Sequence, residues 1–552
     1  MNINNKLFMN CLCFLSCQLM YAQSVSVEQA EHMANTFWVS RTANQEIKKA
    51  KKVTLIGKKQ QPAMYAFSRD SSWVLIAADE RITPILAFSD ENTSEFPSDK
   101  EMPPAIKDLL EWYEYQIEYI RDSTDITEKS SGWISHRDDP GIGLLTPVPP
   151  LLTHNGVNNA WGQWENNSGP YVNSIFNKSY NKFCPLLDGC SQHSPAGCVA
   201  VAISQVMWYW QWPNAAVVGD GYGNYLLREY DWSLMPTHLY NYSPDNEVDM
   251  IASLLHDVGL SVNIDYDCYE SGANSALIPA ALNKFNYLAD EMIFRNSYTN
   301  NQWLQLLKDE LDRGRPVLYG GQFTNNKGHQ FVIDGYMYDN HFHVNLGGNG
   351  EYIGYFLLDS ISDGLKYYTI NQSAILHIHP NYPTCSDIMV QPSESWQPNF
   401  SKFNGGGMTI GNRTIASNHK GVIFSGDYVR LTNGFHISAG AEVRIGIRDI
   451  ACDVPLLLNS APTSTERVAR SAKAGYTHTK KSLSLSPNPV SDILYIRSSE
   501  ALKQVRIYNL NGQCLLQTTK TEINVSALPA GLYILIAQTA TDDTLQSKFV
   551  KQ

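Results

Sequence analysis

The chain has few charged residues and no excess of positive charge. Charged side chains make up 17% of its 552 residues, and 54 acidic residues against 42 basic ones give a net charge of −12. Domains that bind nucleic acid carry a basic patch, and the same feature draws proteins to anionic membranes. We therefore expect no nucleic acid and no anionic membrane surface among the partners.

Long hydrophobic runs are missing after the first few residues. Lys6 precedes an apolar run from Leu7 to Met20, and Ala22 offers a small residue at a cleavage point. A run this short is typical of a signal peptide rather than a membrane-spanning helix. We assign residues 1–22 to a signal peptide and expect a protein that is secreted or held at the cell surface, without a membrane anchor.

Two common hydrolase motifs are also absent. The sequence has neither His-Glu-x-x-His, which binds zinc, nor Gly-x-Ser-x-Gly, which presents a serine nucleophile. His341 with His343, and His377 with His379, each place two imidazoles on one strand face, but no third ligand follows at a typical metal-site spacing. The sequence therefore predicts no metal and no cofactor.

What the chain does have is a cysteine where a turn gives way to a helix. Cys198 follows Ser194-Pro195-Ala196-Gly197 and precedes an apolar, helix-compatible run from Val199 to Met207. Unpaired N–H groups and the helix dipole stabilise a thiolate at such a position. His329 begins a strand-like run downstream, at the separation of about 130–150 residues found in papain-type proteases. We predict that Cys198 is a nucleophile and His329 its general base and acid.

Two amide side chains are candidates for the remaining roles of a cysteine protease. Gln163 lies upstream of the nucleophile, where its amide can donate to an oxyanion beside the Cys198 N–H. Asn345 is the candidate orienter of the imidazole, because a turn at Asp339-Asn340 brings its strand beside that of His329. A tight turn would nevertheless pair Asn345 nearer Asp334 than His329.

The pattern of apolar residues divides the chain into several parts. Residues 23–143 have a helix–sheet–helix pattern, and residues 144–382 have helices first and an antiparallel sheet afterwards, which is typical of an α+β fold. Residues 383–458 alternate as short strands joined by turns. A linker is expected at 459–481 and a small β unit at 482–552, and we expect both C-terminal modules to resemble β-sandwiches.

Seven cysteines lie outside the signal peptide. With Cys198 reserved for chemistry, six others are available to pair in an oxidising compartment. Cys184 and Cys190 are close enough in the sequence for a local bridge near the active site. The connectivity stays open, and buried free thiols are the alternative for the more distant cysteines.

The motifs together resemble those of streptopain-type cysteine proteases, peptidase family C10, which have a papain-like fold. The resemblance is carried by Gly197-Cys198-Val199-Ala200, Trp161-x-Gln163 and Gly328-His329-x-Phe331-Val332. It implies a cysteine-type endopeptidase with Cys198, His329, Gln163 and Asn345 as catalytic residues. It also implies substrate binding by Ser271, Gly272, Ala273 and Gly328, and protein or peptide substrates.

The two ends of the chain carry further resemblances. Ala77-Ala78-Asp79-Glu80-Arg81 and Met102-Pro103-Pro104-Ala105 are similar to the streptopain propeptide, which implies a zymogen whose propeptide blocks the cleft until it is cut between Thr127 and Pro150. Leu485-Ser486-Pro487-Asn488-Pro489 and Leu528-Pro529-Ala530-Gly531-Leu532-Tyr533 resemble the sorting domain of type IX secretion. That likeness implies the type IX secretion machinery as a partner.

One departure from the family pattern leaves a second function open. After His343-Val344-Asn345 the family usually has Trp-Gly-Trp-Gly-Gly, whereas this chain has Leu346-Gly347-Gly348-Asn349-Gly350. The tryptophans are expected to shield the contact between the histidine and its orienter. The alternative to an endopeptidase is therefore a weakened or inactive surface binding protein, such as an adhesin, on a protease scaffold.

Overall fold

The computed structural model divides the chain into two compact units, one within Met1–Pro462 and one within Thr463–Gln552, which are described separately. The described residues are 24–41, 52–57, 61–69, 72–90, 96, 104–123, 128–133, 148–163, 179–219, 225–322, 328–337, 340–350, 353–358, 371–448, 450, 452, 483–486, 490–498, 502–508, 514–529, 531–539 and 544–551. The predicted signal peptide, the linker at 459–481 and most of the predicted cleavage region lie outside them.

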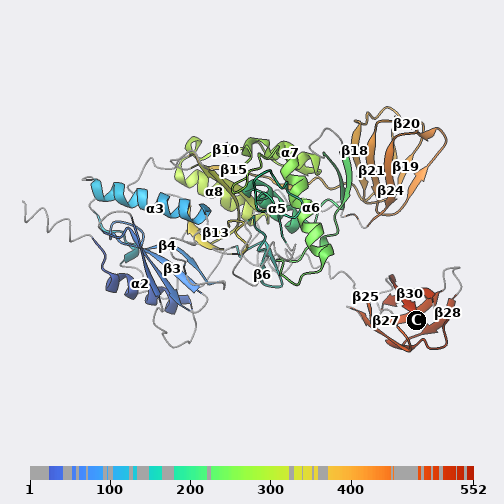
Figure 1. Ribbon diagram of the computed structural model, residues 1–552, viewed down its shortest axis with the longest axis horizontal. Coiled ribbons are helices and arrows are strands. Elements are labelled where there is room, and N and C mark those ends of the chain that lie inside the picture. Colours follow the sequence, from blue (N-terminus) through green and yellow to red (C-terminus); the bar gives the residue numbers. More distant parts are fainter. Residues whose placement is uncertain are drawn as a thin grey trace, which may run out of the picture. The chain divides into compact units, whose positions relative to one another are not determined.

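The N-terminal part, residues 24–133, has the predicted helix–sheet–helix order (Figure 1). Helix α3 begins at Pro104, where the missing N–H removes no hydrogen bond. Helix α2 buries Ala30, Met33, Ala34 and Phe37, which recur at the spacing of one helix face. The elements are α2 (Val27–Arg41), β1 (Lys52–Ile56), β2 (Met64–Arg69), β3 (Ser72–Ala77), β4 (Ile85–Ser89) and α3 (Pro104–Asp122).

The central part, residues 148–382, places its helices before the main strands, as the α+β interpretation requires. Its helices are α5 (Cys198–Trp210), α6 (Asp245–Ser261), α7 (Ile278–Lys284) and α8 (Asn300–Asp312). Its sheet strands are β10 (Ile293–Phe294), β11 (Val317–Gln322), β12 (Gly328–Tyr336), β13 (His341–Asn345), β14 (Gly354–Leu357) and β15 (Ser373–Ile375). Strand β15 ends at Ile375, and His377 beyond it has a left-handed φ of 55°.

The N-terminal and central parts share one sheet. Its ten strands run in the order β1-β2-β3-β4-β14-β13-β12-β11-β15-β10, and every neighbouring pair is antiparallel. The junction is β4 against β14, where Phe88 faces Tyr355 and Ala87 faces Phe356. Helices α3 and α8 contribute to one apolar core with this sheet, and α2 belongs to a second core that includes Tyr355.

A buried tyrosine reinforces that junction. The Tyr113 hydroxyl of α3 lies 3.1 Å from the carbonyl oxygen of Leu86 in β4 and 2.8 Å from that of Leu357 in β14. Its ring is fully buried, and burial raises the pKa of the phenol well above its usual range. The hydroxyl is therefore a neutral group that contacts both sides of the junction.

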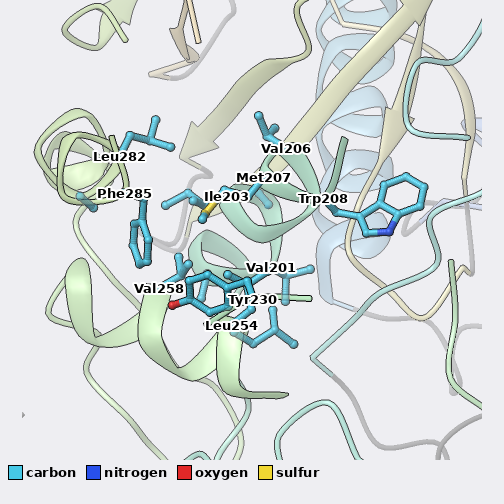
Figure 2. Packing of buried hydrophobic residues seen from close by; sticks show 14 of the residues in the cluster. Val201, Ile203, Val206, Met207, Trp208, Tyr230, Leu254, Val258, Leu282 and Phe285 are labelled. Atoms are coloured by element: carbon cyan, nitrogen blue, oxygen red, sulfur yellow. The ribbon is translucent and has the colours of Figure 1, made fainter. Parts of the chain in front are cut away.

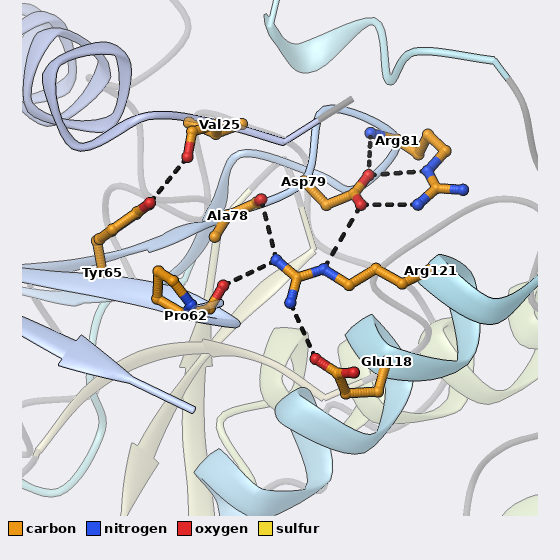
Figure 3. A network of polar contacts seen from close by, with 8 residues as sticks. All are labelled: Val25, Pro62, Tyr65, Ala78, Asp79, Arg81, Glu118 and Arg121. Atoms are coloured by element: carbon orange, nitrogen blue, oxygen red, sulfur yellow. Dashed lines mark hydrogen bonds and ion pairs between the residues drawn. The ribbon is translucent and has the colours of Figure 1, made fainter. Parts of the chain in front are cut away.

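A polar network fixes the end of α3 to the N-terminal strands (Figure 3). The buried carboxylate of Asp79 accepts hydrogen bonds from the Arg81 guanidinium at 2.7 and 2.9 Å. Arg121, near the end of α3, lies 3.8 Å from Asp79 and 2.9 Å from Glu118, and it donates to the Ala78 carbonyl. This network connects α3 to the segment that follows β3.

Residues 383–452 form short strands as expected, but their arrangement is not a β-sandwich. The strands pair in parallel and stack as successive coils, so that residues about one coil apart lie side by side. We call these residues the coil module. Its strands are β17 (Ile388–Val390), β18 (Asn399–Asn404), β19 (Met408–Ile410), β20 (Arg413–Ile415), β21 (Lys420–Ser425), β22 (Val429–Leu431), β23 (Phe435–Ile437) and β24 (Glu442–Ile447).

The coil module packs against the central part. Val422, Phe424 and Ile450 belong to the same apolar core as α5, and the Trp212 ring lies 5.3 Å from that of Phe403. At the rim, Glu229 pairs with Arg444 at 2.6 Å and with Arg448 at 3.3 Å. A disulfide between Cys385 and Cys452 joins the first and last turns of the module.

The C-terminal unit consists of two antiparallel sheets around a small apolar core, which agrees with the expected β-sandwich. One sheet holds β25 (Leu483–Ser486), β26 (Ile493–Ser498) and β29 (Glu522–Asn524). The other holds β27 (Leu502–Tyr508), β28 (Cys514–Thr518), β30 (Gly531–Thr539) and β31 (Thr544–Lys551). Within the described residues of the whole chain, no helix is both long and apolar enough to cross a membrane.

Candidate active site

Cys198 is the first residue of α5, as the sequence predicts. Gly197 caps the helix with a φ of 84°, a conformation that glycine adopts without strain. A Cβ at Gly197 would lie 2.4 Å from Cδ1 of Ile264 and 3.0 Å from the carbonyl oxygen of Ser271. Cys198 therefore follows a close approach of two chain segments that only glycine permits.

The rest of α5 is a buried support for this first turn. Val199 to Trp208 are all buried, and they pack against α6, α7 and the segment around Tyr230 (Figure 2). Since the helix is surrounded by apolar side chains, its N-terminal end has little freedom to shift. The packing holds the half-buried Cys198 at a fixed position.

The surroundings of Cys198 favour the thiolate. Burial raises the pKa of the thiol. The charge of His329, and hydrogen bonds from the His329 side chain and from the backbone at Gln330 and Val199, lower this pKa by more than burial raises it. The net result is a pKa below the usual value for cysteine. The structure thus brings Cys198 and His329 together from α5 and β12.

The imidazole of His329 is oriented by a main-chain carbonyl. Nε2 of this buried residue lies 2.9 Å from the carbonyl oxygen of Leu346, directly after β13. A carbonyl oxygen can only accept a hydrogen bond, so Nε2 carries a proton. That leaves Nδ1 as the atom able to take a proton from the Cys198 thiol.

Asn345 does not make the predicted contact with His329. Its Oδ1 accepts from Nε2 of Gln205 at 3.0 Å and from the Gly347 N–H at 3.1 Å, and its Nδ2 lies 2.6 Å from the carbonyl oxygen of Asn159. The cause is the strand register, which pairs Asn345 with Val332 rather than with His329. Val332 is two residues from Asp334 and three from His329, so Asn345 pairs nearer Asp334, as a tight turn predicts.

Asn345 instead belongs to a buried amide cluster with Asn159 and Gln205. Nε2 of Gln205 also lies 3.3 Å from Oδ1 of Asn159 and 3.3 Å from the Trp161 carbonyl oxygen. The cluster joins α5, which carries Cys198, to the segment before Gln163 and to the end of β13, directly before Leu346. Sequence reasoning missed Asn159 and Gln205, although Gln205 is a polar residue within the apolar run of α5 and offered a signal.

Gln163 is buried close to the nucleophile turn. Asn181 links the two, because its Nδ2 donates to the Gln163 carbonyl at 2.8 Å and its Oδ1 accepts from the Ala196 N–H at 2.9 Å. Among the described residues, none forms a hydrogen bond with the side-chain amide of Gln163. Asn181 is a further site residue that the sequence did not reveal.

The predicted substrate-binding residues divide between two places. Ser271, Gly272 and Ala273 belong to a loop whose Ser271 carbonyl approaches Gly197. Gly328 is exposed at the start of β12, next to His329 in the chain. Both segments border Cys198 or His329, as a peptide-binding role requires.

The disulfide near the site differs from the local bridge suggested by sequence proximity. Cys190 pairs with Cys268, and Cys184 is buried and forms no disulfide. The two cysteines that lie close in the sequence therefore do not pair, because the fold brings residues 265–273 to Cys190 instead.

His341 and His343, one of the two histidine pairs, form hydrogen bonds within the fold. Nδ1 of His343 lies 2.5 Å from Oδ1 of buried Asp334, and Nε2 of His341 lies 3.2 Å from the Ile85 carbonyl oxygen in β4. No group of three His, Cys, Asp or Glu side chains that could hold a metal ion occurs among the described residues. His341 thus contacts the N-terminal part rather than a neighbouring ligand set.

Three sequence families match separate parts of the chain. The Peptidase C10 family matches residues 176–356, which include Cys198 and His329. The family described as Spi protease inhibitor matches residues 22–117, and the secretion system C-terminal sorting domain matches residues 484–552.

The chain is also similar to individual proteins. It is 25% identical over 411 residues to the thiol protease/hemagglutinin PrtT of Porphyromonas gingivalis, covering 69% of this chain and 45% of that protein. It is 27% identical over 360 residues to streptopain of Streptococcus pyogenes, covering 60% of this chain and 84% of streptopain. The chain thus spans less than half the length of the Porphyromonas protein.

Two solved structures are similar to parts of the chain. A prointerpain A fragment of Prevotella intermedia has 25% identity and a TM-score of 0.42, covering 59% of this chain and 98% of the fragment. Active interpain A cysteine protease has 27% identity and a TM-score of 0.33, covering 41% and 93%. The sequence thus contains a peptidase C10 domain, with a Spi protease inhibitor domain before it and a secretion system C-terminal sorting domain after it.

Proposed function

We propose that the chain is an exported cysteine endopeptidase that cleaves protein substrates with the Cys198 thiolate and His329. The observation that carries the proposal is the contact of these two side chains at the start of α5, which lowers the pKa of the thiol. A depressed thiol pKa beside an imidazole is the requirement for nucleophilic catalysis by cysteine.

The reaction is an acyl transfer. The Cys198 sulfur attacks the peptide carbonyl carbon, and the oxyanion accepts hydrogen bonds from the Cys198 N–H and the Gln163 amide. His329 then gives its Nδ1 proton to the leaving amine as the C–N bond breaks. Water, deprotonated by His329, attacks the thioester and releases the acid and the thiol. Residues 271–273 and Gly328 border the substrate.

The N-terminal part would keep the enzyme latent. Its strand β4 extends the sheet of the peptidase domain, and Tyr113 contacts both sides of the junction. Maturation is proposed to cut the connector between Thr127 and Pro150. The sorting domain would direct export through the type IX machinery, and a hydrophobic side chain would occupy the S2 pocket of the mature enzyme.

The missing tryptophans after Asn345 favour a second candidate, a binding protein with weak or no catalysis. One experiment separates the two functions. Processed wild-type protein should hydrolyse casein and lose this activity on treatment with iodoacetamide. Cys198→Ala should be inactive and accumulate as precursor, whereas Cys184→Ala, the matched control at the buried thiol, should behave as wild type. An intact Cys198 thiol without turnover on any peptide would reject the endopeptidase.

A further inference from the structure

The Cys190–Cys268 disulfide joins two segments that border the nucleophile. Cys190 lies in the loop that leads to α5, and Cys268 lies in residues 265–273, which we call the substrate loop. The disulfide is therefore eight positions before Cys198 on one side and three positions before Ser271 on the other.

The base of the substrate loop is fixed without the disulfide. The Asp265 N–H donates to the Gly272 carbonyl at 2.8 Å, and the Gly272 N–H donates to the Asp265 carbonyl at 3.1 Å. The Ser271 carbonyl lies against Gly197, where even a Cβ would approach to 3.0 Å. These contacts place one end of the loop directly beside the nucleophile turn.

The tip of the loop lies at the surface. Tyr269 is 82% exposed, and its N–H donates only within the loop, to Oδ1 of Asp267 at 3.1 Å. The Asp267 N–H lies 3.4 Å from the Ser271 hydroxyl, again within the loop. The bond from Cys268 to Cys190 adds a covalent cross-link, besides the main chain, between this tip and the loop that leads to α5.

We propose that the Cys190–Cys268 disulfide is a specificity-determining brace, which holds the substrate loop in the position that binds an extended peptide at Cys198. The inference rests on the proposed function, since it takes this loop as a wall of the cleft. A loop that is already ordered loses less conformational entropy when a substrate binds. Without the brace, substrate binding would have to order the tip each time.

If the disulfide acts as a brace, its removal should change KM for a peptide substrate but not the reactivity of the Cys198 thiol. In Cys190→Ser/Cys268→Ser, the KM for a peptide that fills several subsites should rise about 5-fold while kcat changes little. The rate of Cys198 alkylation by iodoacetamide should stay unchanged, because this small reagent makes no use of the loop. A merely destabilised enzyme would not show this division.

The chain supplies a matched control in its other disulfide. Cys385→Ser/Cys452→Ser removes a bond that closes a loop of similar length, 67 residues against 78, and so has a similar effect on the unfolded chain. Its KM should equal that of the wild type under conditions where thermal unfolding shows all variants to be folded. An equal rise of KM in both double variants, or no rise in either, would overturn the brace.

A second measurement does not depend on turnover. In the full-length Cys198→Ala precursor, amide hydrogen exchange over residues 265–273 should be faster when Cys190 and Cys268 are both serine, and unchanged when Cys385 and Cys452 are serine. Unchanged exchange in the first case rejects the brace whatever the activity. Absence of Cys198-dependent turnover in wild type, with faster loop exchange, would reject the proposed function but keep the brace on the loop.

Discussion

The Nε2 atom of His329 lies 2.9 Å from the carbonyl oxygen of Leu346. Since the acceptor belongs to the main chain, any residue at position 346 can supply it. The replacement of the family's tryptophan by leucine therefore leaves the orienting contact in place, although it removes a large ring from the cleft. This relationship explains how the orientation of His329 can be kept while the sequence departs from the family pattern.

The first prediction concerns that main-chain acceptor. Leu346→Met, which conserves the volume of this buried side chain, should keep a kcat close to that of the wild type and lose less than about 1.5 kcal/mol of stability. Steady-state kinetics and urea unfolding measure the two effects. A large fall in kcat without loss of stability would mean that the leucine side chain, rather than the carbonyl, orients His329.

The amide cluster should contribute to both stability and catalysis. Asn345→Ala leaves the Gln205 amide and the Asn159 carbonyl without this partner in a buried site, so we expect a loss of about 3 kcal/mol in the free energy of unfolding. The value of kcat should fall as well, because the cluster joins the elements that carry Cys198, Gln163 and Leu346. Gln305→Ala on the exposed face of α8 is the control, and an equal effect there would contradict the role of the cluster.

The reactivity of Cys198 should persist to unusually low pH. Because the pKa of its thiol is lowered, the thiolate survives below the ordinary cysteine range, and alkylation should slow only as pH falls through the lowered value. The same shift stabilises the fold above the ordinary pKa, and this stabilisation disappears as pH falls through the lowered one.

His329→Ala supplies the comparison for the pH profile. It removes the charge and the hydrogen bond that lower the pKa while burial remains, so the alkylation midpoint should move to higher pH. The rates are measured with iodoacetamide by mass spectrometry of the peptide that carries Cys198, so that alkylation at other cysteines is counted separately. An unchanged midpoint would show that His329 does not stabilise the thiolate.

Gln163 should act on the transition state rather than on the thiol. Gln163→Ala is expected to lower kcat by about 10²- to 10³-fold, as loss of an oxyanion donor does elsewhere, with little change in KM. Cys198 should still react with iodoacetamide at the wild-type rate. If alkylation slowed in parallel with turnover, Gln163 would be supporting the nucleophile instead.

A single cut in the connector should not free the prodomain. The shared sheet and the apolar core remain after cleavage, so the prodomain should comigrate with the peptidase domain in gel filtration of a precursor cut between Thr127 and Pro150. Tyr113→Phe removes the hydrogen bonds to Leu86 and Leu357, and it should shift material to the dissociated peak. Complete separation in the unaltered protein would contradict this.

The elements that carry the nucleophile were predictable because their signals are local. The turn before Cys198 and the apolar run after it predict the start of α5, and the strand around His329 follows from its apolar residues. The α+β class followed from the order of these elements.

The contacts that were missed depend on long-range geometry. Asn345 meets Gln205 and Asn159 through strand register and helix packing, neither of which leaves a trace in the neighbouring residues. Cys190 likewise pairs with the distant Cys268 rather than the nearby Cys184. In the coil module, alternation of apolar residues predicts strands but is the same for parallel coils and for antiparallel hairpins.

The shared sheet also has a consequence for the mature protein. When the prodomain departs, β14 loses its neighbour β4 and becomes an edge strand. The backbone groups at Tyr355 and Phe356 would then be exposed to water. An unprotected edge strand can pair with a strand of another molecule and so promote aggregation. At high concentration, the protein without its prodomain should therefore aggregate more readily than the precursor, in which β4 covers this edge.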